Sequence, residues 1–255
     1  MINLDKKYIF THIEKTGGTS VSSEIMRHDI KGMYFINVDF SSYSNGEVRL
    51  TDVEEIKLSP FTEISNDYAN KHTSLLTFKC FMPEEEWNRY YKFAFVRHPI
   101  YRIVSLYLHQ LKSALKIDAP PEEILKQKYI PVRFNENVPM CTKPGDEYTI
   151  KKGNHDFTLE FFIKKVLVPG GLSQIYQVTN ENNRLLPDFI GKFENLQEDY
   201  DKVCDHIKIP KTKLPHLNSG GGNNEIYEKF YTDDLKQFVY EQYKEEFELF
   251  GYDHI

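Results

Sequence analysis

The chain has 255 residues, enough for one α/β domain with a large buried core. Its formal net charge is −6, with the acidic excess in residues 190–255 and the rest balanced, which excludes a nucleic-acid binder with a basic face. Three cysteines, Cys80, Cys141 and Cys204, are too few and too widely spaced for a disulfide framework or a zinc site, and no uncharged stretch is long enough to span a membrane.

The N-terminal residues lead directly into a strand-like run, so we expect no signal peptide or membrane anchor and a cytoplasmic protein. This run, residues 7–13, is apolar and typical of a buried parallel strand. A glycine-containing turn at residues 16–19 follows, and a helix is predicted over residues 20–27. Residues 33–38 are predicted to form a second strand.

The turn after the first strand has the composition of a site for a phosphate-like anion. Its two glycines let the backbone curl closely around an anion, and main-chain N–H groups of the turn and the new helix point at one spot. A lysine adds positive charge, and three hydroxyls add donors. The expected anion-binding residues are Lys15, Thr16, Gly17, Gly18, Thr19 and Ser20. A plain strand–turn–helix corner with capping hydroxyls would have the same pattern.

This turn is not a Walker A loop. That pattern places its lysine after the glycines, whereas Lys15 precedes Gly17 and Gly18. ATP chemistry is therefore disfavoured, magnesium has no obvious ligand set, and no metal is expected.

The next predicted elements precede and flank a second anion motif. Residues 41–70 are polar and irregular, with a short helix near residues 61–68. A short helix is predicted over residues 83–89, a buried strand over Tyr91–Val96, and a long helix over residues 99–115.

Arg97 is the second candidate for binding an anion. It stands at the carboxyl end of a buried strand, where open α/β sheets bind ligands, and its guanidinium can grip a phosphate with two hydrogen bonds. Ser105 lies about two turns into the following helix and reaches the same anion only if that helix runs alongside it. Alternatively, Arg97 pairs with a carboxylate and Ser105 only packs. Arg102 is expected to make a structural pair, and His98 to start the helix.

The second half of the chain continues the alternation of strands and helices. Residues 116–153 are predicted to be loop-like and proline-rich, a setting in which substrate clefts are often built. The alternation predicts a parallel, doubly wound sheet. The remaining elements are expected at residues 158–168 (helix), 189–193 (strand), Leu196–Ile207 (helix) and 232–247 (helix).

Two segments resemble a known family. Residues 12–20 resemble the 5′-phosphosulfate loop of sulfotransferases that use 3′-phosphoadenosine 5′-phosphosulfate (PAPS), and residues 95–107 resemble their 3′-phosphate motif. The carbohydrate type that includes heparan 2-O-sulfotransferases is the most similar group, since residues 190–196, 214–218 and 247–252 resemble it too. The resemblance implies one sulfotransferase domain over residues 1–255, with a P-loop-like parallel sheet flanked by helices. The unmatched residues 116–153 are then expected to be a substrate-side insertion.

By this resemblance, PAPS is the donor, 3′-phosphoadenosine 5′-phosphate (PAP) is a product, and a hydroxyl, expected on a carbohydrate, is the acceptor. The loop residues would hold the 5′-phosphosulfate, Arg97 and Ser105 would hold the 3′-phosphate, and the glycine-rich turn at residues 219–222 would close over the nucleotide. Two positions depart from the family: Glu14 replaces the usual proline, and His98 replaces the common Asn or Asp. Glu14 brings negative charge near the loop unless its side chain turns away.

The same resemblance suggests how transfer is catalysed. Lys15 would stabilise the charge that develops on the bridging oxygen of the leaving group. His72 is the candidate base, because it lies between the two motifs in a His-x-Ser setting similar to that of the heparan 2-O group. His72 could instead be an ordinary loop histidine, with Glu24 or an acid in residues 41–63 as the base. His12 is expected to be structural.

Two other function classes stay open. A P-loop kinase acting on a small molecule would need ATP and magnesium, which the glycine–lysine order disfavours. A catalytically inactive carbohydrate-binding module would have lost the key cations, but Lys15 and Arg97 are both present. A peptide tyrosine or a lipid-linked sugar also fits the acceptor role.

Overall fold

The computed structural model describes residues 1–37, 57–60, 72–113, 119–126, 131–134, 138–140, 148–150, 153–167, 173–215 and 224–254. The chain divides into two compact units. The first comprises Met1–Arg97 and Gln174–Leu217, and the second comprises His98–Ser173 and Asn218–Ile255. Each unit has buried apolar clusters of its own.

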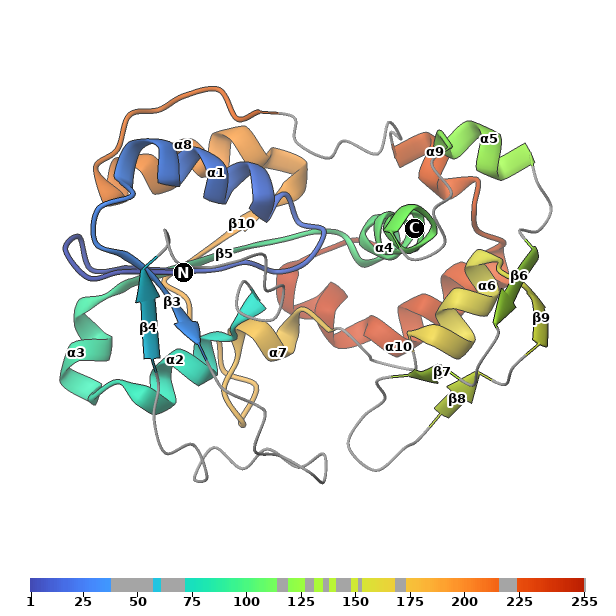
Figure 1. Ribbon diagram of the computed structural model, residues 1–255, viewed down its shortest axis with the longest axis horizontal. Helices are drawn as coiled ribbons and strands as arrows, with labels where there is room; N and C mark the ends of the chain where they lie inside the picture. Colours follow the sequence, from blue (N-terminus) through green and yellow to red (C-terminus); the bar gives the residue numbers. More distant parts are fainter. Residues whose placement is uncertain are drawn as a thin grey trace. The chain divides into compact units, whose positions relative to one another are not determined.

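The described part of the first unit is built on a six-stranded sheet with the order β10-β5-β2-β1-β3-β4 (Figure 1). Strands β2, β5 and β10 run parallel, whereas β1, β3 and β4 pair antiparallel. The strands are β1 (Ile2–Asn3), β2 (Tyr8–Thr11), β3 (Met33–Asn37), β4 (Lys57–Pro60), β5 (Tyr91–Val96) and β10 (Phe189–Lys192).

The α/β class and the sheet flanked by helices are confirmed, and the sheet is mixed. The expected parallel pairing is found for β2, β5 and β10. The antiparallel strand β1 precedes β2 by only a short turn, and a short turn can join antiparallel strands but not parallel ones. The two-residue β1 has too little sequence to show a hydrophobic pattern.

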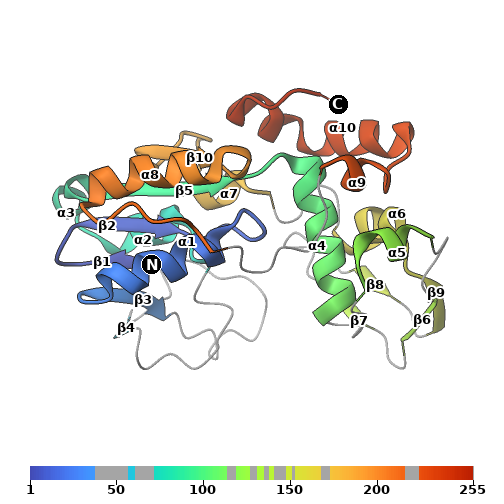
Figure 2. The ribbon, with the colours of Figure 1, turned by 90° about the horizontal axis from the view of Figure 1, so that it is seen from above.

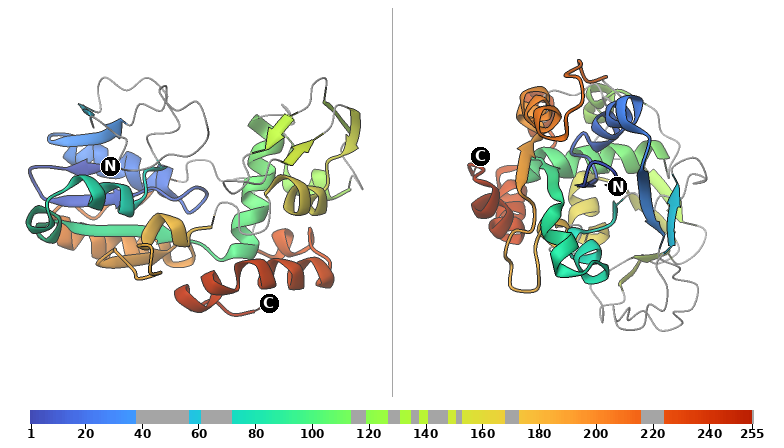
Figure 3. Two further views of the ribbon diagram at one scale, coloured as in Figure 1. Left: turned by 90° about the horizontal axis from the view of Figure 1, so that it is seen from below. Right: turned by 90° about the vertical axis from the view of Figure 1, so that its left-hand side faces the viewer.

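Helices cover both faces of this sheet (Figures 1 and 3). On one face, Phe10 and Phe93 pack with residues of α1 and α8; on the other, Ile9 packs with residues of α2 and α3. Consecutive strand residues thus bury on opposite faces, which explains why all of β2 is buried. The helices of this unit are α1 (Gly18–Asp29), α2 (Leu75–Phe81), α3 (Glu84–Arg89), α7 (Ile175–Val178), α8 (Leu196–Ile207) and the short turn η5 (Phe193–Asn195).

The second unit is mainly helical in its described part. Helix α4 packs against α9 and α10 (Figure 2), and Tyr107 of α4 lies in an aromatic cluster with Phe157 and Phe162. The helices are α4 (Pro99–Ser113), α5 (Pro121–Lys126), α6 (Leu159–Phe161), η4 (Phe162–Val166), α9 (Asn224–Glu228) and α10 (Asp233–Phe250). The strands are β6 (Pro131–Phe134), β7 (Val138–Met140), β8 (Tyr148–Ile150) and β9 (Gly153–Asp156).

The prediction that residues 116–153 are loop-like is wrong for the described positions. Pro121 is the first residue of helix α5, β6 pairs with β9, and β7 pairs with β8. These strands are too short to show periodicity, and their pairing depends on non-local contacts. Whether the segment is a substrate-side insertion stays a prediction.

Several predicted elements match closely, including Tyr91–Val96, Leu196–Ile207 and the last helix, where the Thr232 hydroxyl accepts a hydrogen bond from the Leu235 N–H. The predicted helix at residues 61–68 and the glycine-rich turn at residues 219–222 lie outside the described residues. Within the described ranges, no helix combines the length and apolar character needed to cross a bilayer.

Candidate anion-binding and active site

The loop between β2 and α1 makes two turns into left-handed backbone. Lys15 has φ 63° and Gly17 has φ 81°. A lysine in this region is strained by about 1 kcal/mol, because its Cβ crowds the backbone. The Thr16 hydroxyl donates to the Ile13 carbonyl at 2.9 Å, and this buried bond ties the loop to the end of the strand. Thr16 therefore shapes the loop through its side chain.

Helix α1 begins at Gly18 without a side-chain cap from the described residues. Gly17 occupies the cap position, and its carbonyl accepts from the N–H groups of Ser20 and Val21 at 3.0 and 3.2 Å. The N–H groups of Gly18 and Thr19 precede the first possible helical bond. Together with the positive end of the helix dipole, they create a favourable environment for an anion.

Both loop glycines are required by close packing. A Cβ on Gly18 would overlap the imidazole of His12, and a Cβ on Gly17 would lie 2.7 Å from Cδ2 of Leu196. His12 itself stacks on Phe10, with ring centroids 6.0 Å apart. The glycines thus allow the helix start to approach His12 and α8, a reason beyond the predicted curling around an anion.

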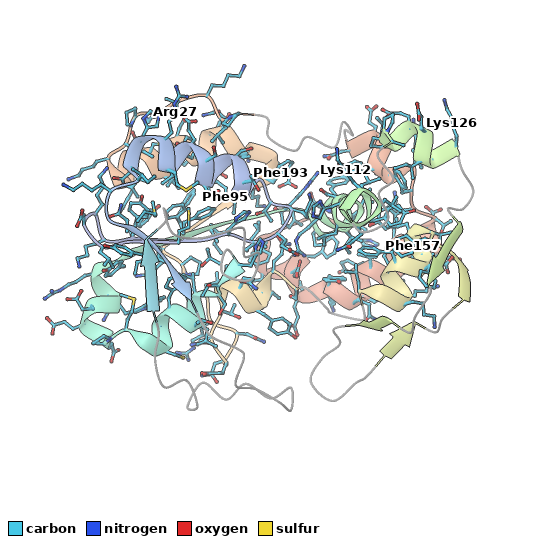
Figure 4. All side chains as sticks on the ribbon, in the orientation of Figure 1. Arg27, Phe95, Lys112, Lys126, Phe157 and Phe193 are labelled. Carbon is cyan, nitrogen blue, oxygen red and sulfur yellow. The ribbon has the colours of Figure 1, made fainter. Side chains whose placement is uncertain are left out.

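Arg97 is held at the end of β5 by contacts to its backbone and its side chain. The Gln174 amide pairs twice with the Arg97 main chain: Oε1 accepts from the Arg97 N–H, and Nε2 donates to the Arg97 carbonyl, both at 2.8 Å. The guanidinium carbon lies 4.1 Å from the ring centroid of Phe193 (labelled in Figure 4), and Nη1 donates to the Lys15 carbonyl at 3.4 Å. Arg97 is 6% exposed, so these contacts fix a buried cation beside the loop.

Lys15 and Arg97 create a local concentration of positive charge. Burial lowers the pKa of the Lys15 ammonium, and the nearby Arg97 guanidinium lowers it further, whereas the Glu14 carboxylate acts in the opposite direction. An anion beside both cations would relieve their repulsion. The pair therefore fits a ligand with at least one strongly anionic group.

His72 comes from a distant part of the sequence but lies against the same loop. Its Nδ1 is 2.6 Å from the His12 carbonyl oxygen, and its Nε2 is 3.7 Å from Oε1 of Glu14. The serine of the His-x-Ser pattern, Ser74, caps helix α2 by accepting a hydrogen bond from the Thr77 N–H. Lys15, Arg97 and His72 are thus brought around one turn of the first unit.

Other residues singled out from the sequence have different surroundings. Thr19 is exposed and Ser20 is buried at the start of α1. The reserve base Glu24 accepts from Thr212 at 2.6 Å and contacts His28 at 3.0 Å, and the hydrogen bond from Thr212 holds its pKa below the usual range. Ser105 belongs to the second unit, on α4, and its contact with the 3′-phosphate stays a prediction.

His98, the second departure from the family pattern, is buried in the second unit. Its Nε2 is 3.1 Å from the Asp253 carbonyl oxygen, and it packs against the rings of Tyr101, Phe247 and Tyr252. These contacts agree with the expected structural role at the start of a helix.

Two residues that position Arg97 were missed in the sequence. Phe193 lies in a segment already noted for its resemblance, residues 190–196, which was the available signal. Gln174 gave none, because a lone glutamine outside any motif does not reveal a partner 77 residues away. Within the described residues, no group of three or more His, Cys, Asp or Glu side chains is arranged to hold a metal ion.

The model of the sulfotransferase family matches residues 1–253. No curated protein matches the chain. No solved structure matches it either.

Proposed function

This chain belongs to the sulfotransferase family, and from that premise we propose that it transfers a sulfuryl group from PAPS to a hydroxyl of a carbohydrate. The observation that carries the proposal is the adjacency of the two predicted anion-binding cations. Arg97 Nη1 lies 3.4 Å from the Lys15 carbonyl, in a loop that leads into the N-terminus of helix α1. PAPS carries anionic groups at both its 5′ and 3′ positions, which suits two cations on neighbouring elements.

Different residues would bind the two anionic ends of the donor. Lys15, the N–H groups of residues 16–19 and the hydroxyls of Thr19 and Ser20 would bind the 5′-phosphosulfate. Arg97 would bind the 3′-phosphate, with Ser105 as its predicted partner. The packing that holds Arg97 before any ligand arrives supports this role, because a preformed site loses less conformational entropy on binding.

Transfer would need one cation and one base. His72 would take the proton of the acceptor hydroxyl as its oxygen bonds to sulfur. Lys15 would stabilise the negative charge that appears on the 5′-phosphate oxygen as the old sulfur–oxygen bond breaks. Positioning and electrostatics would supply most of the rate enhancement, as in phosphoryl transfer.

Thermal shift with two nucleotides tests the donor. PAP at about 100 times its Kd should stabilise the protein by about 2.7 kcal/mol, whereas ATP with magnesium should give little shift. Stabilisation by ATP–magnesium but not by PAP would overturn the proposal in favour of a kinase. A second assay offers labelled PAPS to carbohydrate, peptide-tyrosine and glycolipid acceptors, and label transferred only to a non-carbohydrate would correct the acceptor class.

A further inference from the structure

The contact between His72 and the His12 carbonyl identifies which nitrogen of His72 carries the proton. A carbonyl oxygen can only accept a hydrogen bond, so the ring nitrogen 2.6 Å from it, Nδ1, must be the donor. In the neutral ring the lone pair then lies on Nε2. The backbone of the strand end thereby assigns the basic position of His72.

The Glu14 carboxylate faces that same nitrogen. Its Oε1 lies 3.7 Å from Nε2 of His72, too far for a hydrogen bond but within ion-pair distance. Glu14 stands where the family usually has proline, so the departure from the pattern places a carboxylate beside the candidate base. Its side chain does not turn away from the loop region; it turns toward His72.

Packed rings and backbone hold His12, the residue whose carbonyl contacts His72. The His12 ring is 4.8 Å from the His72 ring and stacks on the buried Phe10. Because Gly18 has no side chain, the start of helix α1 packs directly against the His12 ring. Because His12 is buried in this way, its carbonyl is a fixed reference point for His72.

We propose that Glu14 is a positioning residue that acts through His72. This inference rests on the proposed function. The His12 carbonyl selects the Nδ1–H form, and the Glu14 carboxylate stabilises the ring after Nε2 has taken a proton. Among the described residues, the Glu14 carboxylate and the His12 imidazole lie against the His72 ring, and the Glu14 carboxylate also attracts the Lys15 ammonium.

The acceptor O–H bond gives its proton to Nε2, and its electron pair forms the new oxygen–sulfur bond. The bond between sulfur and the 5′-phosphate oxygen breaks, leaving its pair on the phosphate. The imidazolium then returns its proton to water. Glu14 attracts the charged ring and not the neutral one, so it lowers the barrier instead of tightening substrate binding.

A double-mutant cycle on the full chain tests whether Glu14 acts through His72. Glu14→Gln should lower kcat roughly tenfold, with KM for PAPS unchanged or lower because a negative charge near the loop is gone. Glu14→Asp should recover part of the loss. On a His72→Gln background, Glu14→Gln should have no further effect. The matched control Glu85→Gln, at an exposed carboxylate on α3, should leave kcat unchanged.

Equal kcat losses from Glu14→Gln with and without His72 would overturn the inference, since Glu14 would then act independently. A larger loss from Glu14→Gln than from His72→Gln would make Glu14 itself the base and would also overturn it.

Nitrogen NMR of the histidine rings tests the geometry around His72, and this test does not depend on sulfotransfer activity. His72, assigned by comparison with His72→Gln, should show a protonated Nδ1 and an unprotonated Nε2 in its neutral form. A proton on Nε2 would overturn the inference even in an active enzyme. Conversely, the expected signal from a protein that transfers no sulfuryl group would support the geometry and defeat the proposed function.

Discussion

The two anion motifs of this chain are built in different ways. The first, around Lys15, is made by consecutive residues: a left-handed turn, two packed glycines and a helix start that no described side chain caps. The second depends on one side chain, Arg97, held by Gln174 and Phe193 from distant parts of the chain. Local backbone geometry forms one site, and long-range packing forms the other. Substitutions should therefore affect the two motifs through different routes.

Removing the loop cation should have the largest effect. Lys15→Ala should lower kcat by roughly 10²–10³-fold, because the charge on the leaving oxygen loses its preorganised partner. The fold should survive, since the loop keeps its Thr16 bond and its glycines. Steady-state kinetics with labelled PAPS measures the loss. Lys244→Ala, at a surface lysine of α10, is the control and should change kcat little. A kcat near the normal value would show that the first motif does not act on the transition state.

Removing the second cation should act on binding. Arg97→Ala should weaken PAP binding by roughly 100-fold, about 3 kcal/mol, because the 3′-phosphate of PAP loses its buried guanidinium partner. Calorimetry measures this directly, with Arg89→Ala on the exposed side of α3 as the matched control. Undiminished PAP affinity would remove Arg97 from the donor site and break the comparison.

Gln174 tests whether packing at a distance forms the second motif. Gln174→Ala should leave the buried Arg97 N–H and carbonyl without their side-chain partner and cost about 2–3 kcal/mol of unfolding free energy, which lowers Tm by several degrees. PAP affinity should fall roughly tenfold as Arg97 loses its fixed position. Gln174→Glu keeps the acceptor oxygen and removes the N–H donor. Its PAP affinity and Tm should therefore lie between those of the unchanged protein and those of Gln174→Ala. Equal PAP affinity in all three proteins would assign Gln174 to stability alone.

Phe193 should have the smallest effect. Phe193→Leu keeps the apolar contact with the loop but removes the ring under the guanidinium, so PAP affinity should fall about two- to fivefold. Titration of PAP by calorimetry, together with Tm, separates this from a packing loss. A large drop in Tm with normal affinity would mean that Phe193 only supports Gly17 and α8.

The difference between the motifs also explains what could be predicted from the sequence. The loop of Lys15 was predictable, because strand, glycines and helix follow one another and each leaves a local pattern. Arg97 was predictable as a residue at a strand end, but the amide that holds it was not. His72 was placed beside the loop only through the family resemblance, and its contact with Glu14 joins positions that no local rule connects. The short strands of residues 131–156 were missed for the same reason.

The left-handed backbone of Lys15 has a consequence for protein engineering. Glycine adopts a positive φ without steric strain, so Lys15→Gly should relieve the loop and raise stability by up to about 1 kcal/mol while removing the ammonium. A screen that ranks variants by melting temperature alone would therefore favour this change and enrich inactive protein. At this position thermal robustness and the proposed chemistry are in direct opposition.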